Sequence, residues 1–234
     1  MIPTIVAIDG PSGAGKSTVA RALAERLGVP YIDTGAMYRA VGLAARERGV
    51  VLPIPDPEAV SDIAGRVSIE LEFSEGATRV RLDGRDVSDE IRLPEISLYA
   101  SAVSAIPGVR RRLVVEQRRM AAARGAVMEG RDIGTRVFPD TPHKFFVTAP
   151  LAVRAERRAR ELAARGTPQP FEAVRAEIER RDHADSTRAD SPLTLDPSYT
   201  TVDTGLRSVE EIVDDLERRV RSGGAADRSE GRSG

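Results

Sequence analysis

The chain has 234 residues, of which 41% are hydrophobic and 30% are charged, with a formal net charge of −1. This size suits one large domain with insertions, and no apolar run approaches the roughly 20 residues that a membrane helix needs. A near-neutral charge with 4% aromatic residues argues against a nucleic-acid partner, and the lack of cysteine with only two histidines argues against disulfides and a zinc site. We expect a cytoplasmic protein without a membrane partner, in which any metal arrives with a substrate.

Short apolar segments alternate with helical patterns along the chain. The segments are TIVAI (4–8), VPYI (29–32), AVM (126–128), KFFVT (144–148) and YTTVD (199–203). Strands separated by helices pair in parallel through right-handed crossovers, and helices then cover both faces of the sheet. The predicted fold class is therefore α/β, with a five-stranded parallel sheet.

Two stretches give the helices that cover this sheet. Val19, Leu23 and Leu27 mark one face of a helix after the first strand. Near the end of the chain, Ser208 and Glu211 form a capping-box pattern before a further amphipathic helix. We expect both helices to pack on the sheet.

One region departs from the alternation of strands and helices. In VSIELEF (67–73) every second residue is apolar, and TRVRL (78–82) then meets an Asp83-Gly84 turn. This pattern predicts a small antiparallel β insert within about residues 60–95. We assign residues 1–221 to a single domain and residues 222–234, which lack periodicity and a hydrophobic face, to a disordered tail.

The segment GPSGAGKST (10–18) lies between the first predicted strand and a helix. Gly10, Gly15, Lys16 and Ser17 fill the G-x-x-x-x-G-K-[ST] pattern of a phosphate-binding P-loop. In such a loop, backbone N–H groups and the helix N-terminus hold phosphate oxygens, and Lys16 reaches the β- and γ-phosphates. Ser17 is placed to ligate Mg²⁺ that comes with ATP. The predicted ATP-binding residues are Gly10, Pro11, Ser12, Gly13, Ala14, Gly15, Lys16, Ser17 and Thr18.

The choice of lysine supports this interpretation over a plain strand-to-helix turn. Lys16 and Lys144 are the chain's two lysines among 35 basic residues. A compact ammonium fits between two phosphates where a planar guanidinium is too wide. We interpret Lys144, which precedes an apolar strand, as a solvated flank.

A P-loop alone leaves GTPase switches, motor ATPases and small-molecule kinases open. The chain has no Asn-Lys-x-Asp guanine motif, and its length leaves little room for the extra machinery of a motor. Transfer to a small molecule is therefore favoured, and the acceptor has to be identified from other segments.

The segments after the second and third predicted strands carry polar groups to the carboxyl edge of the sheet, where open α/β sheets bind ligands. In DTGAMYRA, Thr34 and Arg39 are candidates for binding a second anion, with a helix N-cap at Asp33 or Thr34 as the alternative. In EGRDIGT, Arg131 lies beside Asp132, and a charged turn is the alternative.

A further charged segment, RRDHADSTR, continues a predicted helix. Arg181, Asp185 and Arg188 follow at i, i+4 and i+7, which places them on one face. An exposed ladder of ion pairs is the alternative. We expect His183 on the helix surface.

The segment 149–166 is rich in arginine and is followed by the helix breakers of GTPQP. It fits either a mobile lid or a charged outer helix. Its arginines are Arg154, Arg157, Arg158, Arg160 and Arg165.

Together these segments indicate a site for two polyanions. Arginines and Mg²⁺ would offset the repulsion between a nucleoside triphosphate and a second phosphate. Since a phosphomonoester with a second pKa near 6 is already largely ionised at neutral pH, the transfer needs no general base. Phosphoryl transfer then depends mainly on alignment and charge neutralisation.

The motifs IDGPSGAGKST, DTGAMYR, EGRDIGT and RRDHADSTR, with the strand insert, resemble the bacterial cytidylate kinases, the CMP/dCMP kinases among the nucleoside monophosphate kinases. The resemblance extends from residue 4 to about residue 220. It implies transfer of the γ-phosphoryl group of ATP, with Mg²⁺, to CMP or dCMP. It also implies a monophosphate-binding region that includes the insert and a helical lid at about residues 152–170. We further expect a monomer.

The resemblance also implies roles for single residues. Cytosine would be recognised by Ser101, Arg110 and Asp132. The phosphate and sugar of the acceptor would be held by Thr34, Arg39, Arg131, Arg181, Asp185 and Arg188. The transfer itself would be assisted by Lys16, Arg131, Arg157 and Arg158. The base assignment is chemically consistent, because a carboxylate accepts from the cytosine N4 amino group and an arginine donates to N3 and O2.

Overall fold

The computed structural model describes residues 4–74, 77–164 and 166–223. The N-terminal half contains β1 (Ile5–Asp9), α1 (Lys16–Leu27), β2 (Tyr31–Asp33), α2 (Thr34–Glu47), α3 (Pro57–Arg66), β3 (Ile69–Ser74), β4 (Ala77–Leu82), β5 (Arg85–Asp86), the 3₁₀ turn η1 (Glu90–Arg92), α4 (Pro94–Ser104) and α5 (Pro107–Ala121). The C-terminal half contains β6 (Ala126–Gly130), the π-helical turn η2 (Ile133–Val137), β7 (His143–Thr148), α6 (Leu151–Ala164), α7 (Phe171–Thr187), β8 (Thr200–Asp203) and α8 (Val209–Arg221).

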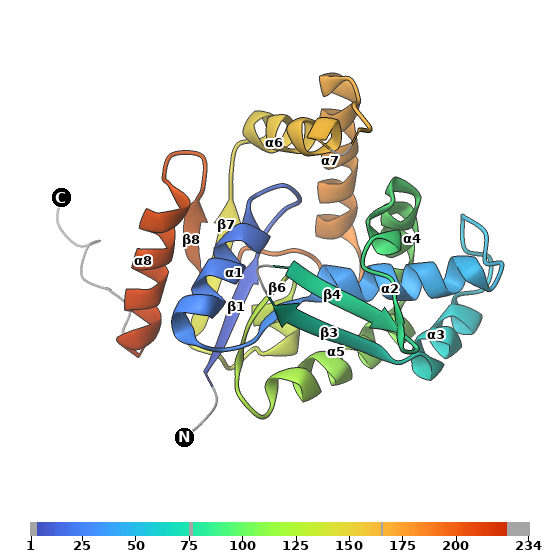
Figure 1. Cartoon of the computed structure of the whole chain (residues 1–234), viewed down its shortest axis with the longest axis horizontal. Coiled ribbons are helices and arrows are strands. Elements are labelled where there is room, and N and C mark those ends of the chain that lie inside the picture. Colours follow the sequence, from blue (N-terminus) through green and yellow to red (C-terminus); the bar gives the residue numbers. More distant parts are fainter. Residues whose placement is uncertain (1–3, 75–76, 165, 224–234) are drawn as a thin grey trace.

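The central sheet is five-stranded and parallel, with the strand order β2-β6-β1-β7-β8. Residues of β1 alternate between its two faces. Val6 and Ile8 pack in the core that α1 and α8 cover, whereas Ala7 packs in the core that α5 and η2 cover. The predicted α/β class, with helices on both faces, is confirmed (Figure 1).

The two helices predicted to cover the sheet pack on it together. Val19 and Leu23 of α1 are fully buried, and Leu27 packs at the margin of the same core. Ser208 accepts a hydrogen bond from the Glu211 N–H while the Glu211 carboxylate accepts from the Ser208 N–H, which confirms the capping box of α8. Both helices thus fix one face of the sheet behind the phosphate-binding segment.

The predicted insert is present as a three-stranded antiparallel sheet with the order β3-β4-β5. Asp83 and Gly84 form its second turn with φ values of 50° and 80°, both in the left-handed region that such a hairpin requires. Val80 and Leu82 bury the insert against a core shared with α2, α3, α4 and α5. The insert therefore belongs to a helical layer at one end of the central sheet (Figure 1).

Helices α6 and α7 pack on each other beyond the carboxyl ends of the strands, at the top of Figure 1. Ala155 and Leu162 of α6 meet Val174 and Ile178 of α7 in a small core of their own. Helix α6 corresponds to the segment predicted as a lid or an outer helix, and α7 is the helix predicted to carry RRDHADSTR. Within the described ranges, no helix is long and apolar enough to cross a membrane. Of the predicted tail, residues 222–234, the first two form the turn that ends helix α8, and residues 224–234 lie outside the described residues.

Candidate active site

A cleft of about 640 Å³ lies at the carboxyl edge of the central sheet. Every site residue predicted from the sequence lines this cleft except Gly10 and Pro11. The segments after β1, β2 and β6 converge at this cleft with α4, α5, α6 and α7. Side chains more than 150 positions apart in the sequence therefore line the same cleft.

The phosphate loop occupies one wall of the cleft. Gly10 has a φ of 148°, and a Cβ there would stand 2.0 Å from the Val147 carbonyl oxygen, so only glycine lets the loop leave β1 at this point. Lys16 begins α1 and is 6% exposed, and its ammonium donates to the Pro11 carbonyl at 2.6 Å. Burial, together with the nearby Arg131, lowers the pKa of Lys16. A phosphate anion bound beside Lys16 would favour its charged form.

A carboxylate lies directly behind this loop. Glu129, the fourth residue of β6, is buried and accepts hydrogen bonds from Ser17 and Tyr31. Burial raises the pKa of Glu129. Hydroxyl and carboxylate oxygens are hard ligands of the kind Mg²⁺ prefers, so the donor set at Ser17 fits the ion. Among the described residues, no group of three or more histidine, cysteine, aspartate or glutamate side chains is placed to hold a metal ion.

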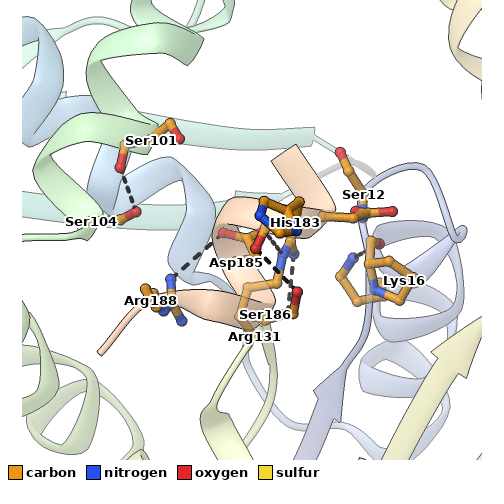
Figure 2. A network of polar contacts seen from close by, with 12 residues as sticks. Ser12, Lys16, Ser101, Ser104, Arg131, His183, Asp185, Ser186 and Arg188 are labelled. Carbon is orange, nitrogen blue, oxygen red and sulfur yellow. Dashed lines mark hydrogen bonds and ion pairs between the residues drawn. The ribbon is translucent and has the colours of Figure 1, made fainter. Parts of the chain in front are cut away.

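The opposite wall of the cleft carries an excess of positive charge. The Arg131 Nε donates to Asp185 at 2.7 Å, and a guanidinium nitrogen of Arg188 lies 3.6 Å from the same carboxylate (Figure 2). Burial and the neighbouring Arg131 and Arg39 lower the pKa of Arg181 to about 10. Several partly buried cations around one carboxylate repel each other, and a bound anion would relieve that repulsion.

The predicted helix face is correct for Arg181 and Asp185 but not for Arg188. Helix α7 ends at Thr187, and Arg188 follows with a ψ of 143°, so it approaches Asp185 from an extended segment. The predicted N-cap is present as well, because Asp33 accepts from the Ala36 N–H at 3.0 Å. The next residue, Thr34, donates through its hydroxyl to the Glu129 carbonyl at 2.7 Å. The same short segment thus caps α2 and lines the cleft.

A buried ion pair closes the far end of the cleft. Arg110 of α5 and Asp132 pair directly, with side-chain exposures of only 3% and 7%. Arg110 also donates to the Ser104 carbonyl at 3.1 Å and lies 5.5 Å from the centre of the Tyr38 ring. Its buried Nε lacks a hydrogen-bond partner within the ranges that the structure describes. A ligand edge that carries both a hydrogen-bond donor and a hydrogen-bond acceptor matches such a pair, because the carboxylate accepts and the guanidinium donates.

Three comparisons with known proteins agree with this geometry. The family model for cytidylate kinase matches residues 6–222. The chain is 47% identical to a cytidylate kinase of Symbiobacterium thermophilum, over 93% of this chain and 96% of that protein. It is 45% identical over 91% of its length to a bifunctional pantoate ligase/cytidylate kinase of Synechococcus sp. (strain JA-2-3B'a(2-13)), of which it spans 39%.

The chain belongs to the cytidylate kinase family. At the level of fold, it is similar to an uncharacterized protein of Eubacterium ventriosum ATCC 27560 with a TM-score of 0.52, 14% identity, and coverage of 94% of this chain and 99% of that one.

Two arginines of α6, predicted to assist the transfer, already have partners. Arg157 donates to the hydroxyl and the carbonyl of Thr204, both at 2.8 Å, and Thr204 in turn donates to the Ala14 carbonyl of the phosphate loop at 2.9 Å. Arg158 pairs with Glu161 at 2.9 Å. Arg157 therefore supports the loop through Thr204, while Arg158 lines the cleft from the next position of α6.

A clamp on the phosphate loop was not predicted from the sequence. The Ser12 N–H donates to Asp182 at 3.2 Å, the Ser12 carbonyl accepts from Arg154 at 3.0 Å, and Arg154 pairs with Asp182 at 2.5 Å. Both backbone groups of Ser12 are thus held by one ion pair between α6 and α7. The available signal was the position of Arg154 on the apolar face of α6, three residues after Leu151. His183, in contrast, is exposed on α7 as predicted.

Proposed function

We propose that this protein phosphorylates CMP and dCMP with ATP and Mg²⁺, and that it releases CDP or dCDP together with ADP. The observation that carries this proposal is one cleft in which a phosphate loop faces a cluster of partly buried arginines, with the buried Arg110–Asp132 pair beside it. A site for one nucleotide would need only the first of these parts. The family membership of the chain supports the same acceptor.

The donor phosphates would lie along residues 10–18, with Lys16 between the β- and γ-phosphates. Lys16 moves no proton in this step; it offsets the charge that builds up on the transferring group. Mg²⁺ bound with ATP near Ser17 would add positive charge at the same phosphates. Arg158 would face the triphosphate from α6.

The acceptor phosphate would bind among Arg39, Arg131 and Arg181. Its ionised oxygen forms a bond to the γ-phosphorus while the bond from that phosphorus to the β–γ bridging oxygen breaks, and ADP leaves with the bonding electron pair. Because the oxygen is already ionised, no side chain has to accept a proton, and no covalent intermediate on the enzyme is formed. Asp185 and Arg188 would orient the sugar and the arginines around it.

Cytosine would be read at the Arg110–Asp132 pair, with Ser101 at its margin. The N4 amino group of the base would donate to Asp132, and Arg110 would donate to N3 or O2. Uracil presents a carbonyl oxygen in place of N4, which would face the carboxylate without a hydrogen bond. The buried pair therefore supplies a reason for a preference between two pyrimidines.

Several finer features belong to the same proposal. The chain acts as a single domain in which β3, β4 and β5 belong to the monophosphate-binding region, and residues 152–170 serve as a lid over ATP. It works in the cytoplasm as a monomer on small-molecule substrates, without nucleic-acid or membrane partners.

The proposal is tested with a panel of monophosphates. ADP release from ATP and Mg²⁺ is measured with CMP, dCMP, UMP, AMP, GMP and no acceptor. We expect fast release with CMP and dCMP and a much lower kcat/KM with the purine nucleotides. Turnover of AMP or GMP equal to that of CMP would contradict the cytosine assignment, and ATP binding without acceptor-dependent release would indicate a nucleotide sensor.

A further inference from the structure

A buried carboxylate outside the cleft joins the two halves of the site. Asp9, the last residue of β1, is completely buried and does not line the cleft. Its carboxylate accepts from the Ile133 N–H at 3.0 Å, the Gly134 N–H at 2.9 Å and the Tyr199 hydroxyl at 2.6 Å. Three donors on one buried carboxylate hold it in a single orientation.

These contacts fix the backbone directly after Asp132. Ile133 and Gly134 begin the turn η2, and the N–H groups of both residues donate hydrogen bonds to the Asp9 carboxylate. On the other side, the Asp132 carbonyl accepts from the Arg136 N–H at 2.8 Å and the Val137 N–H at 3.2 Å. Asp132 itself has a φ of −148° and a ψ of 25°, outside regular helix or strand geometry. The orientation of its side chain therefore depends on what holds this turn.

The surroundings leave the turn little room to shift. A Cβ at Gly134 would stand 2.6 Å from the Tyr199 hydroxyl oxygen. The Tyr199 ring packs edge-on against Phe146 of β7, with ring centres 6.1 Å apart and an interplanar angle of 88°. Ile133 is 1% exposed in the core below α5. Close packing of this kind transmits a displacement of Asp9 or Tyr199 to the neighbouring turn.

We propose that Asp9 and Tyr199 are positioning residues for base selectivity, because they hold the turn η2 so that Asp132 meets Arg110 at the end of the cleft. This inference rests on the proposed function, in which Asp132 reads cytosine. Asp9 also directly precedes Gly10 in the sequence, so one buried side chain borders the phosphate loop and orients the base-reading turn. Neither residue contacts the cleft.

The test compares two variants that change different contacts of this junction. In Asp9→Asn, the side-chain amide nitrogen is a donor and faces a backbone N–H, which is also a donor, so the turn must shift. In Tyr199→Phe, Asp9 loses the hydroxyl donor but keeps its hydrogen bonds from the Ile133 and Gly134 N–H groups. The readout is the ratio of kcat/KM for CMP to kcat/KM for UMP, with the KM for ATP measured alongside. We expect the ratio to fall by about tenfold in Asp9→Asn and by about threefold in Tyr199→Phe, while the KM for ATP stays within about twofold.

A matched control separates positioning from loss of stability. Thr141 donates to the Ile5 carbonyl at 2.6 Å, at the opposite end of the same strand. Thr141→Val removes this hydrogen bond at the far end of β1, so it should lower the melting temperature and leave the CMP to UMP ratio unchanged. If Asp9→Asn does not fold, Tyr199→Phe gives the decision.

The variant Asp132→Ala distinguishes the two levels of the argument. If it loses the preference for CMP while Asp9→Asn and Tyr199→Phe keep the wild-type ratio, the positioning role is overturned and the proposed base site stands. If Asp132→Ala keeps the wild-type ratio, the base site itself is wrong and the positioning role fails with it. A graded loss across the three variants, with Thr141→Val unchanged, supports the proposal.

Discussion

The two walls of the cleft are built in different ways. The phosphate loop spans residues 10–18 and offers mainly backbone groups and one lysine. The opposite wall, which we assign to the acceptor and call the acceptor wall, takes its cations and carboxylates from α2, α5 and α7, from residues 131–132 between β6 and η2, and from the segment after α7. Contiguous backbone chemistry leaves a short motif in the sequence, whereas chemistry shared among distant side chains depends on the whole fold. The first can be identified from a few letters, and the second needs the structure.

The largest effect is expected from a change in the wall that the phosphate loop forms. Lys16→Ala should lower kcat by about 10²- to 10³-fold with CMP and with UMP alike, because it removes the cation that offsets charge on the transferring group. Lys144→Ala is the matched control, since Lys144 donates to the Pro139 carbonyl and to Ser198 away from the cleft. Steady-state ADP release measures both. Equal losses in the two variants would contradict the role of Lys16.

On the acceptor wall, Arg131→Ala should lower kcat/KM for every monophosphate by roughly 100-fold, because Asp185 loses its closest cation and the acceptor phosphate loses a partner. The CMP to UMP ratio should not change, since the Arg131 side chain pairs with Asp185 whereas Arg110 and Asp132 pair with each other. Arg136→Ala, at an exposed position of the following turn η2, should stay within about twofold. A change of base preference in Arg131→Ala would show that the phosphate and base subsites are not separate.

Asp9 lies where the two walls meet, and its titration tests its burial. Burial raises the pKa of Asp9 to about 6 from 3.8. Between these values the folded protein binds the proton that the unfolded chain has lost, so the free energy of unfolding should fall as pH rises from about 4 to about 6, by up to about 3 kcal/mol. The Asp9→Asn variant has no carboxyl group at this position and therefore lacks this titration. Chemical denaturation across this pH range should therefore give a shallower decline for the variant, and parallel curves would refute the shift.

The smallest effect is expected from the clamp on the phosphate loop. Asp182→Asn weakens its pair with Arg154 and its contact with the Ser12 N–H, so the KM for ATP should rise by about tenfold with no change of base preference. Arg160→Ala on α6 is the control, because Arg160 pairs with Glu156 on the exposed surface, where such a pair contributes about 0.5 kcal/mol or less. If the two variants behave alike, the clamp has no role in ATP binding.

Much of the fold follows from local patterns in the sequence. The five parallel strands, the capping box at Ser208 and the Asp83-Gly84 hairpin were all predictable, since each depends on residues close to one another in the chain. The P-loop was predictable for the same reason. Segments at the carboxyl edge could also be assigned to one site from topology alone.

The parts that escaped prediction depend on tertiary contacts. The resemblance suggested Ser101 and Arg110, but no local pattern pointed to either. The pairing of Arg110 with Asp132, the Ser12 clamp and the junction at Asp9 join positions between 22 and 190 residues apart. Arg188 was placed on a helix face, but the helix ends one residue earlier. Spacing along a chain cannot reveal such contacts, because it carries no information on which elements meet.

The most direct test of the account is a competition for the transferred group. ATP labelled at the γ-phosphate is mixed with the enzyme, Mg²⁺ and equal concentrations of CMP and UMP below their KM values, and the labelled diphosphates are separated. If Arg110 and Asp132 read the base, most of the label appears in CDP, and this excess disappears in Asp132→Ala. Equal labelling of CDP and UDP by the wild-type protein would contradict the claim that the buried Arg110–Asp132 pair selects the acceptor.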